Sequence, residues 1–234
     1  MQVRDSVCLV TGANRGLGEV FARLLLDAGA AKVYAAVRSP ESVTVASAQP
    51  VGLDITRPEQ VQAAAHACQD VTILINNAGV MLAQNHLNGP GEDAARTEMA
   101  VNYFGTMAMC RAFAPVLGKN GGGALVNILS VAAWYASPFN GTYASSKAAA
   151  WLLTNEARMQ LHDQGTQVIG VYASFIDTDM SAILTNVPKV SPESVAEQTI
   201  EAIERGHDEV LADDRTRQVK AALPNDLAEL YKPL

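Results

Sequence analysis

The chain has 234 residues, of which 49% are hydrophobic, and it carries a formal net charge of −7 at pH 7. This length and apolar content suffice for one large α/β domain, and no linker rich in Pro, Ser or charge divides it, so we predict a single domain over residues 1–234. The acidic balance leaves no basic face for a phosphate backbone, and no uncharged stretch is long enough to span a bilayer, which argues against nucleic-acid and membrane partners.

Seven short runs rich in Val, Ile and Leu predict strands that are covered on both faces. They are VCLVTG (7–12), AKVYAAV (31–37), VGLD (51–54), VTILINNAG (71–79), GALVNILS (123–130), QVIGVYA (167–173) and DEVLA (208–212). Between them, apolar residues with helical spacing predict helices over 17–28, 58–68, 94–117, 142–162 and 192–205. Strands that alternate with helices predict a doubly wound, Rossmann-type parallel sheet of about seven strands with helices on both faces, with ligands beyond the carboxyl ends of the strands.

A glycine-rich turn, TGANRGLG (11–18), follows the first strand and opens the first helix. Gly12, Gly16 and Gly18 would let the backbone approach the pyrophosphate of a dinucleotide, while the helix N-terminus points its free amides at the phosphates. A tight strand-to-helix turn also needs glycines without any ligand, so the turn alone leaves both interpretations open.

Tyr143 and Lys147 lie one helical turn apart in NGTYASSKAAAWLL (140–153). They could form a surface pair whose polar ends reach water. Alternatively, the Lys charge could lower the pKa of the phenol so that it exchanges a proton near neutral pH. The pair alone favours the surface interpretation.

The motifs TGANRGLG, NNAG (76–79), Asn102, Ser130 and YASSK (143–147) occur together in one order. In this the chain resembles the short-chain dehydrogenase/reductase family, from the first strand to DTDM (177–180). The resemblance implies that Tyr143 is the catalytic acid in reduction and the base in oxidation, and that Lys147 lowers its pKa and binds the nicotinamide ribose. It further implies that Ser130 holds the substrate oxygen. Asn102 would bend its helix and hold a water that connects Lys147 to solvent.

The resemblance also implies a cofactor site that runs along the carboxyl ends of the strands. Its expected residues are Gly12, Asn14, Arg15, Gly16, Leu17, Gly18, Arg38, Asp54, Ile55, Asn77, Ala78, Gly79, Tyr143, Lys147, Ile176 and Thr178. Asp54 would bind the adenine amine and the NNAG loop would follow the adenosine, although Asn76 or Asn77 could instead tie the fourth strand to its neighbours.

Cofactor choice depends on the end of the second strand, where family members that prefer NAD usually place an acid. Here Val37 stands at that point and Arg38 follows. The Arg38 guanidinium, with Arg15 as a second cation, can pair with a 2′-phosphate. We therefore expect NADP(H), with NAD(H) as the alternative. The other interpretation of Arg38 is a solvated loop residue with no ligand.

The expected substrate pocket consists of bulky apolar side chains on loops. They are Met81, Trp134, Tyr135, Phe139, Phe175 and Ile183. Trp134 or Phe139 could equally cap the sheet or lie in a subunit interface. The chain departs from the family after the sixth strand, where Ala173 and Ser174 replace the usual Pro-Gly. The resemblance implies that the segment after the nicotinamide site forms a lid over the substrate. Here that segment, SAILTNVPKV (181–190), is short and has no basic cluster, so we expect charged compounds to be poor substrates.

These observations predict an NADPH-dependent carbonyl reductase, reversible as an alcohol dehydrogenase, for a hydrophobic ketone or aldehyde. The alternatives are an NAD-dependent alcohol dehydrogenase of the same fold and a non-catalytic NADP(H)-sensing binding protein. The resemblance also suggests a homodimer or homotetramer that pairs through the helices 94–117 and 142–162. The apolar residues expected there are Met107, Met109, Phe113, Trp151 and Leu152.

The spacing of the cysteines and histidines predicts neither a disulfide framework nor a metal site. Cys8, Cys68 and Cys110 lie far apart in apolar or helical runs, which is typical of reduced, buried thiols. The four histidines share no ligand spacing, so no metal site is expected. The N-terminus lacks the apolar run of a signal peptide, and we expect a cytoplasmic protein.

Overall fold

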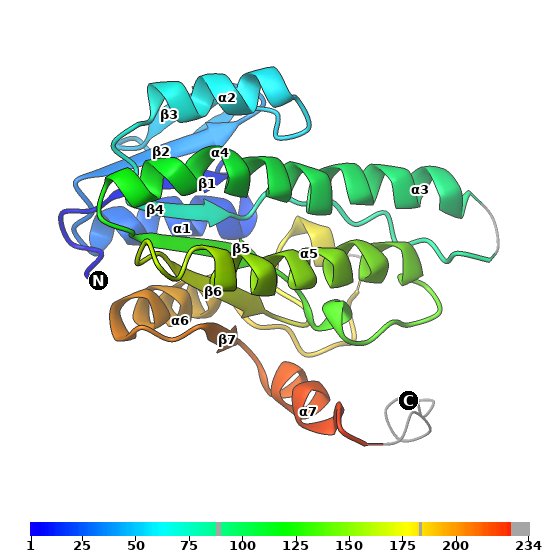
Figure 1. The fold of residues 1–234 in the computed structure, drawn as a ribbon. Helices are drawn as coiled ribbons and strands as arrows, with labels where there is room; N and C mark the ends of the chain where they lie inside the picture. The colour runs from blue at the N-terminus through cyan, green and yellow to red at the C-terminus, as the bar shows by residue number, and fades with distance from the viewer. Residues whose placement is uncertain (88–89, 183, 226–234) are drawn as a thin grey trace.

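The computed structural model describes residues 1–87, 90–182 and 184–225. Its seven strands form one parallel sheet in the order β3-β2-β1-β4-β5-β6-β7, so the chain winds outward in both directions from β1 and β4 (Figure 1). The strands are β1 (Val7–Thr11), β2 (Lys32–Val37), β3 (Gln49–Gly52), β4 (Ile73–Asn76), β5 (Ala124–Ile128), β6 (Gln167–Tyr172) and β7 (Glu209–Leu211). The predicted doubly wound sheet is confirmed.

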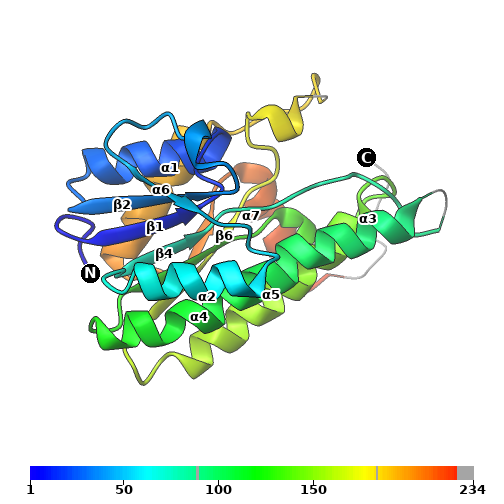
Figure 2. The same cartoon turned by 90° about the horizontal axis from the view of Figure 1, so that it is seen from above.

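Helices cover both faces of the sheet, as Figure 2 shows from above. On one face lie α1 (Gly16–Asp27) and α6 (Pro192–Arg205), which pack together. On the other lie α2 (Pro58–Ala67), α4 (Thr106–Lys119) and α5 (Gly141–Gln160). None of the helices in the described ranges is both long and apolar enough to cross a bilayer.

The core is divided by the sheet into two apolar layers. Cys8 and Val10 of β1 point into the layer under α1 and α6, whereas Leu9 between them points into the layer under α2 and α4. Successive side chains of a strand point to opposite faces, so a strand covered on both sides is apolar at every position. This explains why the central strands read as continuous apolar runs.

The helix predicted over 94–117 follows one path but has three parts. α3 (Gly91–Glu98) leads into a π-helical segment, Met99–Gly105, which continues as α4. Asn102, where the resemblance implied a local bend, lies in this π-helical segment, whose wider turn departs from α-helical geometry.

One predicted element is misplaced, and one helix was not predicted. The third strand lies at 49–52 instead of 51–54, because Asp54 already forms a turn in which its carboxylate accepts hydrogen bonds from the amide and hydroxyl of Thr56 at 2.9 and 2.7 Å. A helix that was not predicted, α7 (Asp214–Ala222), follows β7. Of its residues only Thr216 is buried, so it has no apolar stripe to reveal it.

The expected subunit-contact residues divide between core and surface. Met109 and Phe113 of α4 are fully buried against the sheet of their own chain, so they cannot contact a partner. Leu152 of α5 is 64% exposed, and Met159 on the same helix is 74% exposed. Met107 is half-buried, so the most exposed residue of the expected set, Leu152, lies on the outer face of α5.

Candidate active site

The glycine turn lies beyond the carboxyl end of β1. Gly12 and Gly16 have positive φ angles of +67° and +54°, which disfavour any residue with a side chain. A Cβ at Gly18 would overlap the carbonyl oxygen of Gly12, and one at Gly12 would lie 3.1 Å from the Cα of Ala78. Arg15, at the N-cap of α1, makes no side-chain capping bond, so the first amides of the helix remain available to an anion.

Several expected cofactor residues have side chains that are buried or hydrogen-bonded within the protein. Leu17 is buried in the core beneath the turn, and Ile55 is buried against Gly105 of the π-helical segment. The Asn77 side chain donates to the carbonyl oxygens of Thr11 and Gly12 at 3.0 and 3.3 Å. Its amide therefore holds the glycine turn in place.

The neighbouring asparagine has the structural role that was left open for it. The Asn76 amide donates to the Asn127 oxygen on β5 at 2.8 Å, so it ties β4 to the next strand. Both are buried. The alternative interpretation is thus correct for both asparagine side chains of NNAG.

The cations expected around a 2′-phosphate lie on the surface. Arg38, at the end of β2, is exposed, while Val37 before it is buried. The Thr56 hydroxyl bonded to Asp54 lowers the pKa of that carboxyl, and the charge of Arg38 lowers it further. Arg15 lies 3.5 Å from the carboxylate of Asp179, and both are well exposed. Arg15 thus already has an anionic neighbour, whereas Arg38 stands at the ribose position of the fold.

The expected catalytic residues meet at the carboxyl ends of β4 and β5. Tyr143, Lys147, Ser130 and Asn102 are all buried. The Lys147 ammonium donates to the carbonyl oxygen of Ile128 on β5 at 2.8 Å and lies 5.7 Å from the centroid of the Tyr143 ring. These polar groups face one another inside the protein, so the interpretation of Tyr143 and Lys147 as a solvated surface pair is wrong.

Ser130 follows β5 and is held from both sides. Its hydroxyl accepts a hydrogen bond from the amide of Ala132 at 3.1 Å and donates to the carbonyl oxygen of Ala173 at 3.3 Å. It also interacts with the Tyr143 hydroxyl, which favours the phenolate form of the tyrosine. The two hydroxyl groups are therefore within hydrogen-bonding reach of each other.

Asn102 locks the π-helical segment to the NNAG loop and to α5. Its amide donates to the Val80 carbonyl oxygen at 2.8 Å and to the Ser146 hydroxyl at 2.9 Å, and its oxygen accepts from the Val80 amide at 2.9 Å. Both amide protons are used within the protein. Only the oxygen keeps an acceptor position for the expected water.

Burial determines the protonation of the catalytic pair. It raises the pKa of Tyr143 from 10.0 to about 12, with the Ser130 hydrogen bond opposing the rise and the charge of Glu98 adding to it. Burial also lowers the pKa of Lys147 from 10.5 to about 8. Within the chain alone, the shift of the tyrosine is therefore opposite to the one expected. The cost of placing a phenolate in a low-dielectric interior outweighs the opposing effect of the Ser130 hydrogen bond.

Glu98 is a buried acid beside the site that the sequence analysis missed. One carboxylate oxygen accepts the amide of Leu82 at 2.6 Å, and the other has no hydrogen-bond partner among the described residues. The signal was an acidic residue four positions before Asn102, on a helix segment that packs against α5. Burying a carboxylate costs free energy unless it is paired or hydrogen-bonded.

Five of the six expected pocket residues can be placed, and Ile183 lies outside the described residues. Met81 packs against Tyr143 in a small apolar cluster, and Phe139 is largely exposed on its loop. Trp134 stacks on the buried ring of Tyr172, with centroids 4.1 Å apart. Trp134 therefore caps the end of the sheet, as the alternative interpretation had it.

Phe175 and Tyr135, both half-buried, complete the expected set. The guanidinium of Arg215 on α7 lies 5.5 Å from the centroid of the Phe175 ring, and the ammonium of Lys220 lies 5.4 Å from that of Trp134. Lys220 is also paired with Glu209. Because α7 was not predicted, these two cations beside the pocket aromatics were not anticipated.

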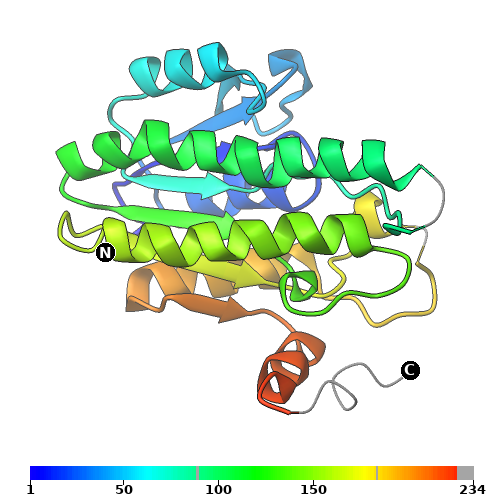
Figure 3. The same cartoon turned by 45° about the vertical axis from the view of Figure 1, so that its right-hand side comes forward.

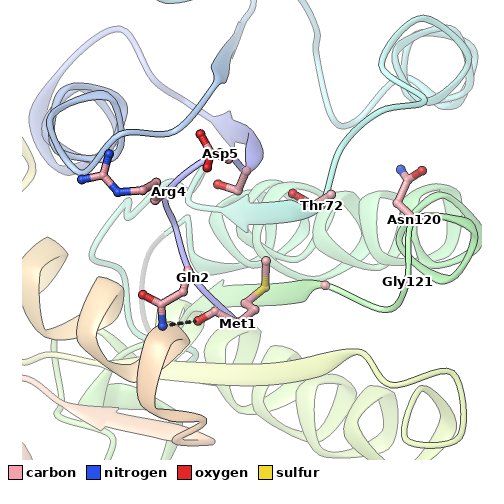
Figure 4. Close-up of a pocket in the computed structure, with 9 residues that line it drawn as sticks. Met1, Gln2, Arg4, Asp5, Thr72, Asn120 and Gly121 are labelled. Carbon is pink, nitrogen blue, oxygen red and sulfur yellow. Dashed lines mark hydrogen bonds between the residues drawn. The ribbon is translucent and has the colours of Figure 1, made fainter.

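A shallow pocket lies at the opposite ends of the strands, away from the glycine turn (Figure 4). It is lined by Met1, Gln2, Arg4, Asp5, Ser6, Thr72, Asn120, Gly121 and Gly123, at the amino ends of β1, β4 and β5. None of these is a candidate catalytic residue. Within the part of the chain that the structure describes, no three His, Cys, Asp or Glu side chains are grouped closely enough to hold a metal ion.

Comparisons with known proteins agree with this geometry. A model of the short chain dehydrogenase family matches residues 6–187. A crystal structure of a short chain dehydrogenase from Burkholderia cenocepacia J2315 in complex with NADP is 41% identical, covers 100% of both chains and has a TM-score of 0.94. An uncharacterized oxidoreductase of Staphylococcus aureus (strain MRSA252) is 28% identical over 211 residues, which are 85% of this chain and 91% of that protein.

A more distant structure shares the fold. The 3-ketoacyl-(acyl-carrier-protein) reductase from Brucella melitensis complexed with NADH is 23% identical, with a TM-score of 0.80 over 89% of this chain and 97% of that one. At this identity the likeness concerns the fold alone. The family model, by contrast, matches well over half of the sequence. The chain therefore belongs to the short chain dehydrogenase family and is an NAD(P)-dependent oxidoreductase.

Proposed function

We propose that this protein is an NADPH-dependent carbonyl reductase that reduces hydrophobic ketones or aldehydes and, in reverse, oxidises secondary alcohols. The observation that carries the proposal is the burial of Tyr143, Ser130 and Lys147 together, next to a glycine turn built for a pyrophosphate. A phenol whose pKa is raised to about 12 is protonated at neutral pH. It therefore carries the proton that reduction of a carbonyl consumes.

NADP(H) is supported by two observations. The apolar Val37 and the exposed Arg38 at the end of β2 offer a cation, and no acid, to the adenosine ribose. In addition, the related protein from Burkholderia cenocepacia was crystallised with NADP. NAD(H) remains the second cofactor of the proposal.

The residues of the chain divide the reaction among them. The bound nicotinamide would supply the hydride that adds to the carbonyl carbon. Ser130 holds the carbonyl oxygen by a hydrogen bond and steadies the negative charge that develops there. Tyr143 gives that oxygen its proton, and Lys147, buried one turn away, stabilises the resulting phenolate. The water expected at Asn102 would return the proton from solvent.

The deciding experiment is Tyr143→Phe, which removes only the transferable proton. We expect ketone reduction to fall by at least about 100-fold while NADPH binding, measured by cofactor fluorescence, stays within about twofold. Tyr34→Phe is the matched control, because the Tyr34 hydroxyl bonds Lys32 and Asp70 at the other end of the sheet. If Tyr143→Phe keeps more than a tenth of the parent rate, Tyr143 is not the acid.

The same assay separates the alternatives. A protein that binds NADPH tightly but oxidises it with none of a panel of activated ketones would be a cofactor sensor. A protein with a higher kcat/KM for NADH would be the NAD-dependent alcohol dehydrogenase. Comparing an aryl ketone with a carboxylated ketone of similar size tests the expected preference for uncharged substrates. Arg215 and Lys220 of α7 are the cations that would oppose this preference.

We also propose that two copies pair through the outer face of α5. Leu152 and Met159 expose most of their apolar surface there, and Trp151, next to Leu152, is half-buried. Large exposed apolar side chains on one helix are typical of a surface that a partner covers.

A further inference from the structure

One carboxylate joins two parts of the fold that lie far apart in sequence. Residues 174–181, which we call the post-β6 segment, include Ile176 and Thr178 of the expected nicotinamide site. The first amide of this segment, that of Ser174, donates to one oxygen of Asp213 at 2.7 Å. The other oxygen of Asp213 accepts the amide of Thr216 at 2.8 Å and caps α7. Asp213 thus links the end of β6 to the helix that follows β7.

The same turn of α7 makes a second contact with the segment. The guanidinium of Arg215 lies 5.5 Å from the centroid of the Phe175 ring, so Ser174 and Phe175 are both held from α7. Figure 3 shows α7 beyond β7 and beside the loop that follows β5. The start of α7 therefore contacts the first two residues of the segment.

The far end of the segment bears on the glycine turn. A Cβ at Gly16 would lie 3.3 Å from the methyl carbon of Thr178, and Arg15 lies 3.5 Å from the carboxylate of Asp179. Between the two ends, the Asp177 amide donates to the carbonyl oxygen of Val190 at 2.9 Å. The segment thus contacts α7 at its first residues and the glycine turn at its last residues.

The residues at the start of the segment do not fix its direction by themselves. Neither Ala173 nor Ser174 restricts its own φ angle as proline would. A backbone with such freedom must be held by contacts from outside, and at its start this contact is the charge-assisted hydrogen bond to Asp213. This makes the carboxylate more than a helix cap.

We propose that Asp213 is a positioning residue for the cofactor: by holding the Ser174 amide, it sets the post-β6 segment against the nicotinamide half of the bound dinucleotide. The proposal rests on the proposed function, because it requires a nicotinamide cofactor in this site. Asp213 acts through the segment and does not touch the reacting atoms.

The test compares two ligands that share the adenosine half. NADPH occupies both halves of the site, whereas adenosine 2′,5′-bisphosphate lacks the nicotinamide. Asp213→Ser keeps an oxygen that can cap α7 but cannot also reach Ser174. Asp213→Asn keeps the reach with only one accepting oxygen. Asp214→Ser is the matched control, since Asp214 pairs with Arg217 on the surface.

We expect Asp213→Ser to raise the Kd of NADPH about tenfold and to leave the Kd of the bisphosphate within about twofold. Asp213→Asn should restore part of the NADPH affinity, and Asp214→Ser should match the parent. The proposal is overturned if Asp213→Ser weakens both ligands equally, or if it lowers only the melting temperature, because Asp213 is then a cap alone.

Failure of the proposed function gives a different result. If the parent binds NADPH but reduces no ketone, the carbonyl-reductase proposal fails while the ratio of the two affinities still decides the role of Asp213. If the parent binds the bisphosphate and NADPH equally well, the nicotinamide half makes no contribution and the positioning proposal is refuted directly.

Discussion

Lys147→Met should change how the stability of the protein depends on pH. Burial lowers the pKa of Lys147 from 10.5 to about 8, so between these values the unfolded chain keeps a proton that the folded chain has lost. Stability therefore rises with pH across this window, because the unfolded state binds more protons. Below pH 8 the folded protein carries the full cost of a buried ammonium.

The size of the effect follows from the two pKa values. Integrating the proton linkage from pH 7 to pH 9.5 gives a rise of about 2 kcal/mol in the free energy of unfolding that Lys147 alone contributes. Methionine has a similar volume and no charge, so Lys147→Met removes this rise. It also loses the hydrogen bond to Ile128, which adds an offset common to both pH values.

Urea unfolding of both proteins at pH 7 and at pH 9.5 measures the effect. Comparing the two is essential, because burial also raises the pKa values of the thiols of Cys8, Cys68 and Cys110, which lowers stability at alkaline pH in both. The stability of the parent relative to Lys147→Met should increase by about 2 kcal/mol from pH 7 to pH 9.5. Lys119→Met, at an exposed position, is the matched control for loss of a lysine. A difference that changes by less than about 0.5 kcal/mol would show that Lys147 is not desolvated as the structure indicates.

Three further perturbations test other parts of the site and the assembly. Arg38→Asp should reverse the preference for NADPH over NADH, since a charge-assisted pair with a 2′-phosphate contributes roughly 1.5 to 3 kcal/mol; equal kcat/KM values in the parent would contradict this. Gly18→Ala should weaken NADPH binding at least about tenfold because its Cβ overlaps Gly12, whereas Gly52→Ala, with an ordinary contact to Pro40, should bind normally. Leu152→Asp should convert a dimer to a monomer by light scattering, and a monomeric parent at micromolar concentration would refute the proposed interface.

The order of the elements could be predicted because each central strand carries its own signal. Leu9 and Val10 point to opposite layers of the core, so burial on both faces makes the whole run apolar. The edge strand β3 lacks this signal, since three of its four residues are exposed, and its position was predicted two residues too late. The polar helix α7 left no periodicity at all, because it buries only Thr216.

The site was predictable to the extent that its residues recur as motifs. Tyr143, Lys147, Ser130 and Asn102 meet as expected, because the ends of parallel strands converge on one edge of the sheet. Their electrostatics were not predictable, since pKa shifts depend on burial and on neighbours distant in sequence. Glu98 is such a neighbour: its effect on Tyr143 depends on how α3 packs against α5, which no local pattern encodes.

The edge formed by β3 also limits how this protein can aggregate. An exposed parallel edge strand offers unpaired amides and carbonyls to a strand of another chain. Here Pro50 has no amide proton to donate, and the strand has only four residues, Gln49–Gly52. A strand of another chain that paired with β3 would therefore lack one hydrogen bond of the ladder, at Pro50. The proline thus protects a sheet whose central strands are otherwise continuous β-forming sequences.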